Sequence, residues 1–194
     1  MATRKPPLRR TSTTTYPIVI FAHDPGPVNY GYAVIRVDGP KTITVLEHGK
    51  FQHTFASLKR GTSVTRQTEK YLGTLEDIYE RHGVNICIAE RFMMRLAGGA
   101  ITIELVNQML GALRAFCWSK SIGLKMIPSS EWKNPIKSMG ILLPDVYKSI
   151  RPVTAHQLDA ALIGTYGSFI LRGVKFNDPK MVLSVIDKVK KCAR

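Results

Sequence analysis

Cysteines are few in this sequence, and they lie far apart. Cys87, Cys117 and Cys192 are odd in number and form no Cys-x-x-Cys pair. The pattern therefore indicates neither a disulfide framework nor a zinc ribbon, because both need paired or closely spaced thiols. It favours a reducing compartment.

Long hydrophobic runs and acidic residues are also scarce. No run of about 18 apolar residues occurs, so the sequence predicts no membrane span. The 194 residues include 14 acids against 28 lysines and arginines, a formal net charge of +14. This excess indicates a polyanionic partner, and nucleic acid is favoured over a membrane surface. With 44% hydrophobic residues, the chain suits one globular domain and is too short for two.

The first 15 residues lack acids and apolar periodicity and contain four basic residues. We expect residues 1–15 to form a disordered basic arm that contacts phosphate backbones. Their richness in Arg, Ser and Thr also resembles an organellar transit peptide, although Pro6 and Pro7 interrupt an amphipathic helix. A cytoplasmic location, in the host if the source is viral, and a mitochondrial or plastid location both stay open.

Apolar patterning predicts a mixed α/β fold. Short β-branched or alternating runs predict strands at residues 17–22, 30–37, 41–51, 85–89 and 123–127. Helical spacing of apolar residues predicts helices at residues 64–82, 103–120, 154–171 and 179–191. The segment 128–147 should be irregular or hold one short helix. This order predicts an antiparallel meander continued by parallel βα units, in a sheet flanked by helices.

The stretch YPIVIFAHDPGPVNYGYAV places an acid, Asp24, at the end of the first strand. Pro25, Gly26 and Pro27 end that strand before a second apolar run begins. A carboxylate on a rigid strand end is a usual mount for a metal ligand, and Gly26 would let a bulky ligand approach the backbone. The simpler interpretation is an ordinary Asp-Pro-Gly turn.

Two later segments repeat or extend this arrangement. The strand at residues 85–89 ends at Glu90, and the helix at 154–171 carries His156 and Asp159 on one face, three residues apart. If these side chains converge with Asp24, they form a set of three carboxylates and one imidazole. Such a set suits Mg²⁺, and its nitrogen ligand tilts it toward Mn²⁺.

Each residue also has a structural interpretation. Glu90 could form an ion pair with Arg91 or Arg95, and Asp159 could be only a cap or dipole partner. A lone His such as His156 is more often a structural residue of its helix. We favour the metal site, because two buried strands ending in acids and a helical His-x-x-Asp pattern seldom coincide by chance.

The segments HDPGPVNYGYAV, AERFMMR and HQLDAALIG resemble the three acidic motifs of the RuvC family of Holliday-junction resolvases, within the RNase H-like superfamily. The resemblance extends with gaps from about Tyr16 to Tyr166. It implies an RNase H-like nuclease domain, which we place at residues 16–172, whereas the amphipathic basic pattern beyond it predicts a C-terminal helix or tail at 173–194. It also implies a homodimer that nicks a four-way DNA junction symmetrically, in DNA recombination and repair.

The chemistry of the predicted site supports a two-metal endonuclease hypothesis, in which the three carboxylates and the imidazole hold two Mg²⁺ ions and Mn²⁺ can substitute. Lys133, in PSSEWK, lies about where a family lysine approaches the scissile phosphate, although an ordinary solvated lysine fits nearly as well. Residues 128–147 lack the glycine-rich lysine pattern of bacterial resolvases, and arms extend beyond the similarity. These departures suggest a viral, phage or organellar branch.

Further candidates concern DNA and partner contacts. Phe92 and Met93 could wedge into an opened junction and Arg95 could meet a phosphate, with core packing as the alternative for the methionine. Met109 and Phe116 could form a dimer seam, because a two-fold junction needs two sites related by two-fold symmetry.

Two other functions stay open. An RNase H or flap-type nuclease would keep the fold and the metals and act on another branched or hybrid substrate. A non-catalytic junction-binding module would keep only the binding of DNA, and the full acidic set argues against it.

Overall fold

The computed structural model describes residues 16–26, 29–52, 64–91, 100–150 and 152–191. One mixed sheet has the strand order β3-β2-β1-β4-β5. Its strands are β1 (Ile18–Asp24), β2 (Asn29–Gly39), β3 (Thr42–Gln52), β4 (Ile86–Glu90) and β5 (Gly123–Ile127). β2 is antiparallel to both β1 and β3, whereas β4 runs parallel to β1 and β5 parallel to β4. The predicted mixed five-stranded sheet is confirmed.

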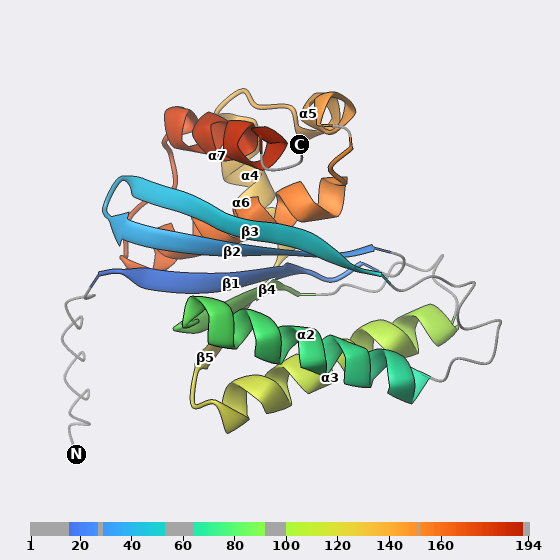
Figure 1. Ribbon diagram of the computed structural model, residues 1–194. Coiled ribbons are helices and arrows are strands. Elements are labelled where there is room, and N and C mark those ends of the chain that lie inside the picture. The colour runs from blue at the N-terminus through green and yellow to red at the C-terminus, as the bar shows by residue number, and fades with distance from the viewer. Residues whose placement is uncertain (1–15, 27–28, 53–63, 92–99, 151, 192–194) are drawn as a thin grey trace, which may run out of the picture.

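Helices cover both faces of the sheet (Figure 1). One face is covered by α2 (Val64–His82) and α3 (Ala100–Ser119). On the other face lie α6 (Ala155–Leu171), α4 (Ser129–Ser138), α5 (Leu143–Ser149) and α7 (Pro179–Lys191). Of these, α6 lies directly against β1 and β2, and α7 packs on α6 and β3. No helix within the described ranges is long and apolar enough to cross a membrane.

Side chains along β1 alternate between the two faces of the sheet. This alternation supplies a core on each face and sets the direction of Asp24, the last residue of the strand. Ile20 and Ala22 belong to the core under α6, whereas Phe21 belongs to the core under α2 and α3. Because side chains two residues apart share a face, Asp24 follows Ile20 and Ala22 toward α6. His23 points the other way, where its ring lies 4.2 Å from that of Phe21, centroid to centroid.

The segment 128–147 differs from its prediction. It forms two helices, α4 and α5, rather than an irregular stretch or one short helix. Trp132 and Ile136 of α4 are buried in the core under α6. Their burial stabilises a helix whose Pro135 argues against it, so tertiary packing outweighs local propensity here.

The direction in which residues of α3 point corrects the predicted dimer seam. Met109 and Phe116 are both buried in the core that α3 forms with α2 and the sheet. The assignment of these two residues to a dimer seam is therefore wrong. On its outward side α3 exposes Trp118, at 85%.

The remaining predictions concern the two ends of the chain and the candidate DNA contacts. The helix expected at residues 179–191 is confirmed as α7, whose buried residues join the core under α6. The basic arm at residues 1–15 and the candidate DNA contacts Phe92, Met93 and Arg95 lie outside the described residues. The division of the chain at residue 172 stays a prediction.

Candidate active site

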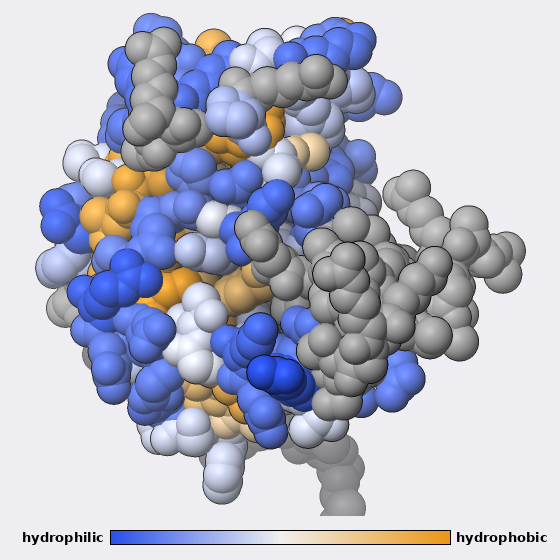
Figure 2. Space-filling view, turned by 45° about the vertical axis from the view of Figure 1, so that its right-hand side comes forward, coloured by the Kyte–Doolittle hydropathy of each residue, from blue (hydrophilic) through white to orange (hydrophobic). Residues whose placement is uncertain are grey.

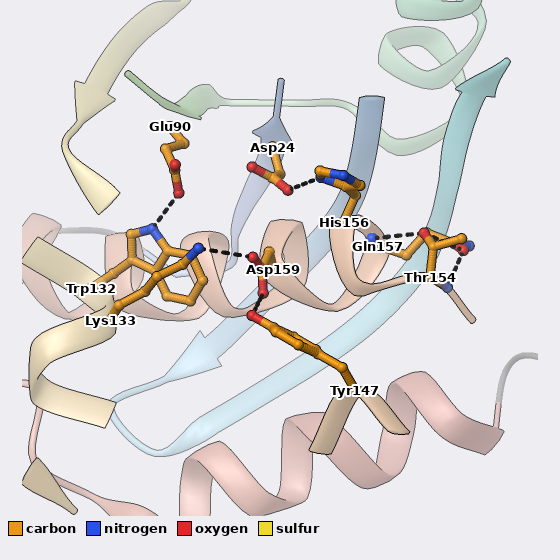
Figure 3. A network of polar contacts seen from close by, with 9 residues as sticks. All are labelled: Asp24, Glu90, Trp132, Lys133, Tyr147, Thr154, His156, Gln157 and Asp159. Atoms are coloured by element: carbon orange, nitrogen blue, oxygen red, sulfur yellow. Dashed lines mark hydrogen bonds and ion pairs between the residues drawn. The ribbon is translucent and has the colours of Figure 1, made fainter. Parts of the chain in front are cut away.

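Two strand ends and the first turns of α6 meet at one edge of the sheet (Figure 3). Asp24 is the last residue of β1, and Glu90 is the last residue of β4, which runs parallel to β1. The carboxyl ends of parallel strands lie at the same edge of a sheet, so both acids lie there. α6 begins above this edge and contributes His156 and Asp159, and the three carboxylates face a common space in Figure 3.

A capping box fixes where α6 begins. The Thr154 hydroxyl accepts a hydrogen bond from the backbone N–H of Gln157, and the Gln157 side chain accepts one from the backbone N–H of Thr154, at 2.9 Å. The side-chain nitrogen of Gln157 also lies 3.2 Å from Nδ1 of His48 on β3. These contacts hold the first turn of α6, and His156 with it, against the sheet.

His156 contacts Asp24 directly. Its Nδ1 lies 2.6 Å from Oδ2 of the buried Asp24. The hydrogen bond to Asp24 raises the pKa of His156, against the effect of burial, and so favours the imidazolium. A Cβ on Gly26 would lie only 2.7 Å from Cε1 of His156. The open backbone at Gly26, predicted to admit a bulky ligand, is thus filled by the imidazole of the same chain.

Glu90 has an indole as its partner. Nε1 of the fully buried Trp132 donates to Oε2 of Glu90 at 2.8 Å. Burial of the Glu90 carboxyl, and next the negative charge of Asp24, raise its pKa to about 7. The neutral acid is therefore present near neutral pH when no cation is bound.

Asp159 is held from two sides. The Tyr147 hydroxyl donates to its Oδ1 at 2.6 Å, and Nζ of Lys133 lies 3.1 Å from its Oδ2. Burial, and then the charge of Asp24, raise the pKa of Asp159 to about 6. Lys133 lies among the carboxylates, with its side chain 40% exposed, and its ammonium also lies 4.7 Å from the centre of the Trp132 ring. This lysine can therefore reach both the carboxylates and the solvent.

No role in the site was predicted from the sequence for Trp132 or Tyr147. Both lie in the segment 128–147, which the sequence predicts to be irregular or to hold one short helix, so their directions could not be inferred from helical spacing. The one available signal for Trp132 was its neighbour Lys133, which had a predicted role. Tyr147 had no such signal, because its contact with Asp159 exists only once α5 has packed beside α6.

The predicted metal ligands do not form a preformed cage. Among the residues that the structure describes, no group of three or more His, Cys, Asp or Glu side chains is placed to hold a metal ion. Each carboxylate has a protein partner instead: His156, Trp132, or Tyr147 with Lys133. The donor chemistry nonetheless fits a hard divalent cation, since two buried carboxylates and the half-buried Glu90 repel one another, with only Lys133 and His156 as cationic partners beside them. The metal roles stay a prediction.

Comparison with known proteins bears on the fold. No protein-family model and no curated protein matches the sequence. Among solved structures, T. thermophilus RuvC in complex with Holliday junction substrate is similar, with a TM-score of 0.65 and 14% identity over 80% of this chain and 96% of that chain. Another Thermus thermophilus RuvC structure is similar with a TM-score of 0.64 and 17% identity, over the same shares of the two chains.

The yeast mitochondrial Holliday junction resolvase Ydc2 is also similar, with a TM-score of 0.59 and 12% identity over 93% of this chain and 87% of that chain. At such low identity these likenesses concern the fold. They confirm the RNase H-like fold that the three acidic motifs predicted.

Proposed function

We propose that this protein is a metal-dependent, structure-selective DNA endonuclease that resolves four-way junctions, or debranches DNA, by paired symmetric nicks. The observation that carries the proposal is the meeting of Asp24, Glu90 and Asp159 at one sheet edge, on the fold of a RuvC whose structure contains Holliday junction substrate. The net charge of +14 supports a nucleic-acid partner.

Asp24, Glu90, His156 and Asp159 would together hold two Mg²⁺ ions, with Mn²⁺ as a substitute. Bound cations of this kind activate an attacking water and stabilise the charge on the leaving oxygen of a phosphodiester.

The chain's own residues orient these groups. His156, Trp132 and Tyr147 each contact a different carboxylate, so the three acids are fixed by side chains that are themselves buried or half-buried. Lys133 supplies the mobile positive charge. Its ammonium would leave Asp159 and donate to a non-bridging oxygen of the scissile phosphate, which lowers the cost of building negative charge there.

Incubation of the purified protein with a synthetic mobile four-way junction tests the proposal. We expect paired nicked duplexes in MgCl₂, no product in EDTA, and no cleavage of linear duplex. Preferential cleavage of an RNA–DNA hybrid or a flap would favour the RNase H or flap-type alternative. Junction binding without cleavage in Mg²⁺ or Mn²⁺ would favour the non-catalytic module and contradict the proposal.

Paired symmetric nicking requires two sites related by a two-fold axis, so the proposal includes a homodimer. Because Met109 and Phe116 are internal, we place its seam on the outward side of α3, which exposes Trp118. Sedimentation should give twice the chain mass of 21.7 kDa, and Trp118→Glu should shift it toward one chain mass. A monomer that still makes paired nicks would contradict this arrangement.

The stability of the protein should depend jointly on pH and Mg²⁺. Without cations, burial raises the pKa of Glu90 to about 7 and that of Asp159 to about 6, above the values of an unfolded chain. The folded state then binds more protons than the unfolded state between about pH 4 and pH 7, so stability falls as the pH rises through this window. Mg²⁺ competes with these protons, so it should stabilise the folded state more at the high-pH end of this window.

Thermal unfolding at about pH 5 and about pH 8, each with EDTA or MgCl₂, measures the effect. We expect the rise in Tm caused by Mg²⁺ to be clearly larger at the higher pH. Glu90→Gln should reduce the difference between the two pH values and leave the part that comes from Asp159. An equal Mg²⁺ effect at both would show that these carboxylates do not bind the ion.

A further inference from the structure

A cavity of about 620 Å³ lies between α4 and α5, beside the candidate active site. Lys133 and Lys137 line it from α4, Leu142 from the turn that follows, and Pro144 and Tyr147 from α5. Its size falls within the range of about 300–1,000 Å³ that is typical of sites for single small ligands. The catalytic chemistry proposed above does not use this cavity.

The cavity and the catalytic edge share two residues. Lys133 and Tyr147 both line the cavity and both contact Asp159, at 3.1 Å and 2.6 Å. A group bound in the cavity would therefore lie directly beside Asp159, one of the residues that we propose hold the metal ions. Lys133 and Tyr147 thus join the cavity to the candidate active site.

The lining combines two kinds of chemistry. Lys133 and Lys137 bring positive charge, whereas Leu142, Pro144 and the ring of Tyr147 bring apolar and aromatic surface. Leu142 is 55% exposed, so its side chain is open to a ligand that enters the cavity from solvent. Figure 2 shows apolar surface among hydrophilic side chains in the upper part of the molecule, where Figure 1 places α5 and α7. Cationic groups next to an apolar, aromatic wall match a nucleotide, whose phosphate is anionic and whose base is flat and apolar on its faces.

We propose that the cavity receives one unstacked nucleotide of the cleaved strand, next to the scissile phosphate. Its base packs against Leu142, Pro144 and the ring of Tyr147, and its phosphate meets Lys137. The inference rests on the proposed function and deepens it. At a branch point a base leaves its stack more easily than in continuous duplex, so a site for an unstacked base selects branched substrates.

Leu142→Gln, made in a cleavage-deficient Asp24→Asn background, tests the base contact. The matched control is Leu183→Gln, since Leu183 is a similarly exposed leucine, at 50%, that lies on α7 and does not line the cavity. Binding is measured by fluorescence anisotropy on two junctions, one intact and one with an abasic site beside the nick position. We expect Leu142→Gln to weaken binding of the intact junction about 5-fold or more, and Leu183→Gln to have no effect.

The abasic junction distinguishes a base in the cavity from a general loss of affinity. If the base occupies the cavity, the abasic site weakens binding by the parent protein by a similar factor, and Leu142→Gln adds no further loss on that substrate. The cavity assignment would be overturned if Leu142→Gln and the abasic site weakened binding independently, so that their factors multiplied, or if Leu142→Gln caused no loss of binding. Either result would leave the proposed function standing. Failure of the parent protein to bind any junction would overturn the proposed function as well.

Lys137→Gln provides a second, independent test. It removes a phosphate contact rather than a base contact. Binding should weaken on intact and abasic junctions alike, with the slope of log K against log salt reduced by about 1. An unchanged salt slope would contradict the place of Lys137 in the site.

Discussion

Asp24→Asn should abolish Mg²⁺-dependent junction cleavage and leave junction binding intact. Asp24 contacts His156, and its charge raises the pKa of both Glu90 and Asp159, so it lies centrally among the ionisable groups of the site. Asn keeps the shape of the side chain and removes the charge that a divalent cation needs. We expect the single-turnover cleavage rate to fall on the order of 10³-fold or more, measured with saturating protein.

The binding measurement decides what the loss of cleavage means. Removal of one negative charge beside a phosphate should leave the junction Kd unchanged or slightly tighter. Asp38→Asn is the matched control, because Asp38 is an acid on β2 that pairs with Arg36 on the surface, and its loss should change neither quantity. Full residual cleavage by Asp24→Asn in Mg²⁺ would remove the basis of the catalytic assignment.

The position of Asp24 and Glu90 could be inferred from the sequence for a simple physical reason. Each follows a short apolar run, and such runs become parallel, buried strands whose carboxyl ends share one edge of the sheet. The pair His156 and Asp159 followed from helical spacing alone. What these patterns fix is the direction of a side chain from its own element, and that is sufficient when the element type is right.

The partners of the acids could not be inferred in the same way. Trp132 and Tyr147 lie on α4 and α5, which local propensity does not predict, because Pro135 stands inside α4 and α5 has only 7 residues. Their placement depends on burial against α6, which is a property of the assembled fold. The error at Met109 and Phe116 has a related cause, since an apolar stripe on α3 has the same spacing whether it faces the protein's own core or a second chain.

The ion-free site is held together by cations of the chain itself. His156 and Lys133 lie against Asp24 and Asp159, where their positive charges reduce the repulsion among the three carboxylates. Divalent cations would take over this role, which frees Lys133 to meet a phosphate. The same exchange explains why we expect the stability of the protein to respond to Mg²⁺ most strongly where Glu90 and Asp159 are ionised.

Gly31→Ala should both destabilise the protein and slow cleavage, although Gly31 has no reactive group. Gly31 pairs with Asp24 across β1 and β2, and the first turn of α6 lies directly on it. A Cβ at this position would lie 2.1 Å from the backbone oxygen of His156 and 2.8 Å from the backbone nitrogen of Gln157. Backbone atoms cannot rotate away as a side chain can, so the start of α6 would have to move off the sheet.

That movement would separate His156 from Asp24 and strain the contact of Gln157 with His48. Overpacking of this kind typically costs about 1–3 kcal/mol, which lowers Tm by roughly 2–4 °C for each kcal/mol in a chain of this size. A displacement of catalytic groups by about 1 Å can slow cleavage on the order of 10²-fold. The pKa of His156, followed by NMR, should also fall toward its ordinary value, since its hydrogen bond to Asp24 is the main cause of the rise.

Gly39→Ala is the matched control, because Gly39 ends the same strand and a Cβ there would meet nothing within 4 Å. Its stability should stay within about 0.5 kcal/mol of the parent protein, with unchanged cleavage. If Gly31→Ala matched this control in stability, cleavage and the pKa of His156, then the first turn of α6 would not rest on β2. The positioning of His156 beside Asp24 would in that case need a different physical cause, because only a side-chain-free position lets the helix backbone come this close.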